Sequence, residues 1–97
     1  MIKGTTVTGF SYEYDEANLD DMRVVDLLAE VMDDNAPAFN KITAISKLLT
    51  MILGADLKAA LYDHIGATHG GRVPRAELEQ ALSEIMGGSG KDAEKNS

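Results

Sequence analysis

The sequence predicts a mainly α-helical protein: a small bundle of about four helices with an extended or β-like N-terminal arm and a flexible C-terminal tail. Three observations predict this class. A central run over residues 39–53 places apolar residues three and four apart, and the same spacing recurs on both sides of it. A period of two occurs only near the N-terminus. At 97 residues the chain fits one domain. We expect an arm over 1–15, a helical domain over 16–87 and a disordered tail over 88–97.

The arm is predicted from the stretch TTVTGFSYEY at residues 5–14, where Phe10, Tyr12 and Tyr14 alternate with Ser11 and Glu13. One strand cannot satisfy its own backbone hydrogen-bonding groups. No second strand is recognised in the sequence. The arm is therefore expected either to pair with a strand from another copy or to lie as an extended segment over its own helices.

The first helix is expected to begin after a cap at Asn18 or Asp20 and to run to about Met32. Pro37 disfavours a helical residue before it and suits the first turn of the next helix. The apolar face of the first helix is predicted from the helical spacing of a set of residues, namely Leu19, Met22, Val25 and Leu28, with Val24, Val31 and Met32 alongside.

The central helix carries the most apolar stretch of the chain, FNKITAISKLLTMIL, in which only Lys41 and Lys47 are charged. A helix that is apolar over so much of its circumference lies either in the centre of a bundle or at a subunit interface. Its length and its two lysines exclude a membrane span, and no other segment is long and apolar enough.

Gly54 either ends the central helix or bends it, and a short third helix is expected over residues 57–65. Gly70 and Gly71 indicate a loop, after which Pro74 opens a fourth helix that Gly87 and Gly88 end. This helix should bury a row of apolar side chains, namely Leu78, Leu82, Ile85 and Ala81. Beyond it no apolar residue exceeds alanine in size, so a flexible tail is predicted.

The net charge of −7 is concentrated in residues 13–34, which contain nine acids and one base, Arg23. This distribution argues against nucleic-acid binding, which requires clustered Lys and Arg. It suits either an ordinary solvated helix face or electrostatic matching to a basic partner. The chain contains no cysteine, so disulfides and thiol chemistry are excluded.

No pattern predicts catalysis, a cofactor or a metal. The stretch GGSGKD lacks both the upstream glycine and the following Ser or Thr of a phosphate-binding loop. His64 and His69 are five residues apart and lack further ligands at helical spacing, so two ordinary surface histidines are favoured over a zinc site. The paired acids fall at expected helix ends and outward faces rather than in a pocket. A non-enzymatic protein is predicted.

Four stretches carry a resemblance to a known family: TTVTGFSYEYDEANLDDM, DMRVVDLLAEV, KITAISKLLTMILG and GGRVPRAELEQALSEIM. Over residues 5–86 the chain resembles the small tail assembly chaperones of long-tailed phages and prophages, of the type found in phages of Gram-positive hosts.

The resemblance implies an α-helical, non-enzymatic chaperone that coats the tape measure protein before the tail tube polymerises. It further implies self-association, a possible contact with the tail tube protein, residence in the host cytoplasm and absence from the mature virion. Such genes are commonly followed by a programmed ribosomal frameshift, with which Gly90-Lys91 is compatible. The alternative is an acidic protein-binding module, such as a phage-encoded inhibitor or DNA mimic.

The expected client or self contacts are apolar residues of the arm and of the central helix. They are Phe10, Tyr12, Tyr14, Phe39, Ile42, Ile45, Leu49 and Ile52.

Overall fold

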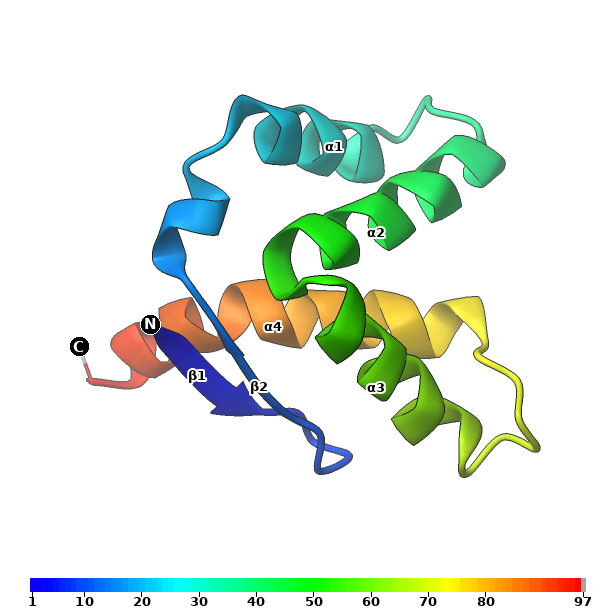
Figure 1. The fold of residues 1–97 in the computed structure, drawn as a ribbon. Helices are drawn as coiled ribbons and strands as arrows, with labels where there is room; N and C mark the ends of the chain where they lie inside the picture. Colours follow the sequence, from blue (N-terminus) through cyan, green and yellow to red (C-terminus); the bar gives the residue numbers. More distant parts are fainter. Residues whose placement is uncertain (97) are drawn as a thin grey trace.

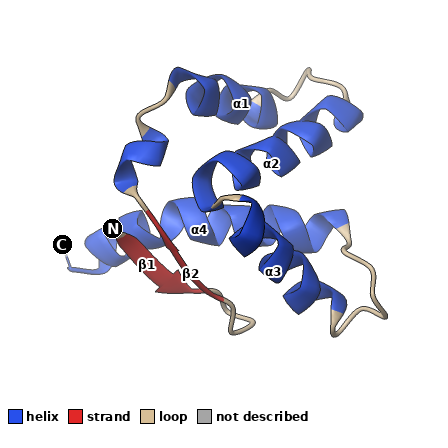
Figure 2. Ribbon diagram, viewed as in Figure 1, coloured by secondary structure: helices blue, strands red, loops and turns tan. Residues whose placement is uncertain are grey.

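In this computed structural model the backbone is described for residues 1–96 and the side chains for residues 1–87. Two strands, β1 (Ile2–Thr5) and β2 (Ser11–Tyr14), precede a short 3-10 helix, η1 (Glu16–Leu19). The α-helices of the described residues are α1 (Met22–Met32), α2 (Ala38–Leu53), α3 (Ala55–Gly66) and α4 (Arg75–Asn96) (Figures 1 and 2). The predicted fold class, mainly α-helical with a β-like N-terminal segment, is confirmed.

The N-terminal segment is a β-hairpin, so the expectation that this chain holds no second strand is wrong. β1 pairs antiparallel with β2 in a register that sets Ile2 opposite Tyr14 and Gly4 opposite Tyr12. Glycine is needed at position 4, because a Cβ there would lie 2.6 Å from Cζ of Tyr12. Since the hairpin pairs its strands within one chain, this segment does not need a second copy to satisfy its backbone.

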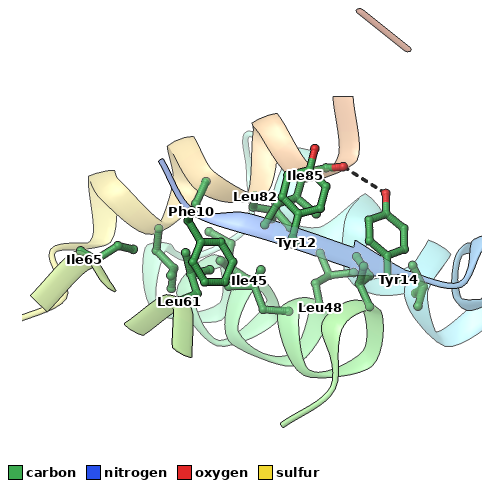
Figure 3. Close-up of a cluster of buried hydrophobic side chains, with 14 residues drawn as sticks. Phe10, Tyr12, Tyr14, Ile45, Leu48, Leu61, Ile65, Leu82 and Ile85 are labelled. Atoms are coloured by element: carbon green, nitrogen blue, oxygen red, sulfur yellow. Dashed lines mark hydrogen bonds between the residues drawn. The ribbon is translucent and has the colours of Figure 1, made fainter. Parts of the chain in front are cut away.

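The central helix of the prediction is α2, and it lies between the other elements (Figure 1). Ile45, Leu48, Leu49 and Ile52 are at most 1% exposed. They form one cluster with aromatic residues of the hairpin, with Leu61 of α3 and with the inward face of α4 (Figure 3). Of the two placements expected for the central helix, the centre of a bundle is confirmed for these four residues, whereas Phe39 at its start is 73% exposed.

Local signals in the sequence position the ends of the helices. Gly54 has a φ of 86°, a conformation that favours glycine, and it separates α2 from α3 rather than bending one helix. The side chain of Asp21 caps α1 by accepting a hydrogen bond from the Arg23 N–H, so the expected cap at Asn18 or Asp20 is wrong. Asn18 instead donates its Nδ2–H to the Ile52 carbonyl at 2.8 Å, which ties η1 to the end of α2.

Helix α4 begins directly after Pro74, as predicted, and buries all four of the expected residues, Leu78, Ala81, Leu82 and Ile85. The helix extends to Asn96, past the Gly87–Gly88 pair at which the sequence predicts its end. The predicted flexible tail over 88–97 lies outside the residues whose side chains the structure describes, and it stays a prediction.

Candidate protein-binding surface

Most of the predicted contact residues lie inside the molecule. Six of them are at most 7% exposed, namely Phe10, Tyr12, Tyr14, Ile45, Leu49 and Ile52. They pack against one another and against α4 (Figure 3). These side chains offer a partner little surface in this conformation, although Ile45 lines a groove between α1 and α4. Phe39, which is 73% exposed, and the half-buried Ile42 are the predicted contact residues that remain at the surface.

The tyrosines of the hairpin have a structural role because their hydroxyl groups bind the backbone of α4. Tyr14 donates to the Ile85 carbonyl at 3.0 Å, as Figure 3 marks, and Tyr12 donates to the Glu84 carbonyl at 3.4 Å. Burial raises the pKa of the Tyr14 phenol above its ordinary value, and the neighbouring Tyr12 adds to the rise. The arm is thus part of the fold rather than a free segment.

Helix α1 is the element that leaves apolar residues exposed. It packs mainly along α2, at the margin of the molecule (Figure 1). Of its residues only Val24 is buried, whereas Met22, Val25 and Met32 are 67%, 46% and 72% exposed. The structure thus leaves three residues of the predicted apolar face of this helix at the surface. With the exposed Ala29 these residues recur at steps of three and four, so they form one row along the helix. We call this row, Met22, Val25, Ala29 and Met32, the α1 ridge.

A groove runs beside the α1 ridge, between α1 and α4. Its cavity volume is about 470 Å³. The groove is lined by Leu28, Val31, Ile45, Glu79, Leu82, Ser83, Met86 and Gly87. Leu28 is three residues from Val25 and four from Met32, so helical geometry places the ridge directly at the edge of this groove. Ridge and groove together form a continuous, largely apolar surface.

Some of the acidic residues around α1 form hydrogen bonds to the local backbone. Asp15, Asp21 and Asp33 each accept a hydrogen bond from the backbone N–H two residues later, at 2.9 Å in every case. Hydrogen bonds from the side chain and backbone of Arg23 hold the pKa of Asp21 below its ordinary value. Capping and turn formation therefore account for three of the nine acids between residues 13 and 34.

The two histidines contact protein groups in the structure. His64 Nε2 lies 3.1 Å from Oγ1 of Thr8 in the hairpin turn, and His69 Nδ1 lies 2.7 Å from the Ile65 carbonyl. Within the part of the chain that the structure describes, no three His, Asp or Glu side chains converge closely enough to hold a metal ion. In that same part, no helix combines the length and apolarity of a membrane span.

Comparisons of this chain with protein-family models, with curated proteins and with solved structures found no match. The sequence pattern missed the α1 ridge because it assigned all the apolar residues of this helix to one packed face. The signal that marks the ridge is the excess of apolar residues, which occupy more of the circumference of α1 than contact with α2 alone can bury.

Proposed function

We propose that this chain is a non-enzymatic binding protein that covers an apolar helix of a client, acting as a phage tail assembly chaperone on the tape measure protein. The observation that supports client binding is the α1 ridge, which exposes large apolar side chains beside an apolar groove. The phage assignment comes from the resemblance of residues 5–86 to the tail assembly chaperones.

The surface suits an amphipathic helix. A client helix presents apolar side chains at steps of three, four and seven, and such a row lies along a groove between two helices. Transfer of these side chains from water is worth roughly 25 cal/mol per Å² of apolar area. The groove contains one charged lining residue, Glu79, which pairs with Arg75 at 3.8 Å. Binding by this surface is thus dominated by apolar contact.

The contact residues proposed from the structure differ from those predicted from the sequence. The ridge and groove replace the buried residues of the hairpin and α2, while Phe39 adds exposed apolar area next to the 33–37 connection that joins α1 to α2. Several copies along a long client would shield its apolar stripe until the tail tube protein polymerises around it. In this role the protein acts in the host cytoplasm, associates with further copies on the client and is absent from the mature virion.

The test is co-purification with the tape measure protein encoded in the same genome. The ridge variant combines Val25→Glu and Met32→Glu, and both sites are exposed enough for the fold to tolerate charge. The matched control is Val7→Glu, at a valine that is 82% exposed in the hairpin turn. We expect the ridge variant to bind at least tenfold more weakly, by roughly 1.4 kcal/mol or more, and the control to bind like the parent chain.

Circular dichroism of all three proteins establishes that they fold alike. Equal binding by the ridge variant and the control contradicts the assignment of the surface. Failure of the parent chain to bind the tape measure protein contradicts the chaperone function.

The alternative, an acidic inhibitor or DNA mimic, makes a different prediction about salt. If the acidic segment mimics DNA, the affinity for the partner should fall steeply between about 50 and about 200 mM salt, as it does for contacts to phosphates. The affinity of an apolar contact changes little over the same range. A steep salt dependence of partner binding that persists in the ridge variant would favour the acidic segment as the binding surface.

A further inference from the structure

A second groove lies on the other side of α1, between α1, α2 and the start of α3, and differs chemically from the first. Its cavity volume is about 510 Å³. It is lined by Arg23, Asp26, Leu27, Ser46, Lys47, Thr50, Met51 and Lys58. We call it the lysine groove. The client surface proposed above does not use these residues.

Hydrogen-bond donors converge in the lysine groove. The Lys58 ammonium donates to Ser46 Oγ at 2.8 Å and to Thr50 Oγ1 at 2.9 Å, and it lies 5.5 Å from the centroid of the Tyr62 ring. An ammonium group has three N–H donors, so one of them has no hydrogen-bond acceptor among the described residues. The Ser46 hydroxyl proton also has none there, because Ser46 Oγ acts only as the acceptor from Lys58. Two donors of the site, one N–H of Lys58 and the hydroxyl of Ser46, thus have no acceptor among the described residues.

The charges of the groove are also unbalanced. Lys47 and Lys58 form no ion pair with a carboxylate of the described residues, although the chain contains 16 acids. Arg23 is paired with Asp21 at 2.9 Å, and Asp26 is the one carboxylate in the lining. In a protein of net charge −7, this groove gathers three cations. Such a site attracts an anion.

The other lining residues of the groove indicate which type of anion fits. Leu27 and Met51 add apolar surface beside the donors, which suits an alkyl group attached to the charged end. Asp26 repels a doubly charged phosphate more strongly than a singly charged carboxylate. We propose that the lysine groove binds an alkyl carboxylate, with its oxygens on Lys58 and Ser46 and its chain against Leu27 and Met51.

The experiment is a titration of the full chain with octanoate, below its micelle concentration, followed by the backbone amide signals in NMR. Acetate carries the charge without the alkyl chain, and octanol carries the chain without the charge. We expect octanoate to shift the signals of Ser46, Met51 and Lys58 saturably, and acetate and octanol each to bind at least tenfold more weakly. Comparable binding of octanol would overturn the role of the donors, and comparable binding of acetate would overturn the role of the apolar walls.

Three variants locate the site. Lys58→Met keeps an unbranched side chain and should weaken octanoate binding at least tenfold, whereas Lys41→Met, at a lysine of α2 outside the lining, should leave it unchanged. Asp26→Asn should tighten binding, because it removes the opposing charge. The ridge variant should bind octanoate like the parent chain, so the two proposals can fail separately. Unchanged binding by Lys58→Met, or the absence of saturable shifts with octanoate, overturns the proposal.

Discussion

The hairpin and α1 differ in how firmly they are packed against the rest of the molecule. The hairpin consists of two strands of four residues each, yet it buries Phe10, Tyr12 and Tyr14 and forms hydrogen bonds to the backbone of α4. Helix α1 has 11 residues and a side-chain cap, yet it buries only Val24 completely. The shorter element is the more firmly anchored, because anchoring depends on what an element packs against rather than on its own regularity.

The two elements differ in the burial of their apolar residues. Those of the hairpin complete the core on α2 and α4, whereas those of the α1 ridge stay in contact with water. Exposed apolar area does not stabilise the fold of a single copy, and contiguous apolar surface of this kind marks interaction sites. The four predictions that follow test the contrast, from the largest expected effect to the smallest.

Tyr14→Ala should lower the free energy of unfolding by about 3 kcal/mol, as is usual for removal of a buried aromatic ring. Tyr14 is 3% exposed and packs in the main cluster, so its loss leaves a cavity and also removes the hydrogen bond to the Ile85 carbonyl. Urea denaturation followed by circular dichroism measures the change. A loss below about 0.5 kcal/mol, the range of surface substitutions, would show that the hairpin is not anchored as described.

Tyr14→Phe keeps the ring and removes only the hydroxyl group, so the expected loss is about 1 kcal/mol at neutral pH. Since burial raises the pKa of Tyr14 in the folded protein, its contribution is complete below the ordinary value of 10.0 and is lost as the pH rises through the folded value. Denaturation at neutral and alkaline pH should therefore show a smaller alkaline loss in Tyr14→Phe than in the parent chain. Equal alkaline losses would contradict the assignment.

Met32→Ala, on the ridge, should change the free energy of unfolding by no more than about 0.5 kcal/mol, since its side chain is 72% exposed. The same denaturation experiment applies, with Tyr14→Ala as the comparison. A loss comparable to that of Tyr14→Ala would mean that the ridge supports the fold and is not reserved for a partner.

The smallest expected effect is the loss of the Asp21 cap of α1 at low pH. Because hydrogen bonds from Arg23 lower the folded pKa of Asp21, its capping contribution is present above the ordinary value of 3.8 and is lost as the pH falls through the folded value. Asp21→Asn keeps an acceptor for the cap and removes the titration, so it should flatten this part of the pH dependence. Hydrogen exchange of the α1 amides at pH 3 and pH 6 measures the loss in both proteins. Parallel pH profiles would contradict this role for Asp21.

The sequence predicted the parts of the fold that depend on local pattern and composition. The spacing of Ile45, Leu48 and Ile52 identified the core helix, and Gly54 and Pro74 marked helix ends because their backbone preferences are local. β1 escaped detection because its stretch IKGT carries a glycine and no aromatic residue, and the need for that glycine is apparent only against the Tyr12 ring across the hairpin.

The candidate surface was harder to predict, since periodicity cannot decide which of two apolar faces a helix buries. Val24 and Val25 are neighbours with similar chemistry, and the structure buries the first and exposes the second. The lysine groove depends on the approach of Lys58 to Ser46, twelve residues apart on two helices. No pattern within either helix predicts that contact.

The attachment of the hairpin to Glu84 and Ile85 has a consequence for longer forms of the chain. These hydrogen bonds hold α4 one residue before Met86 and Gly87, which border the apolar groove beside the ridge. A polypeptide fused directly after residue 87, in place of residues 88–97, would therefore start from a fixed point at the rim of that groove. Such a fusion would hold the added segment next to a bound client at high local concentration.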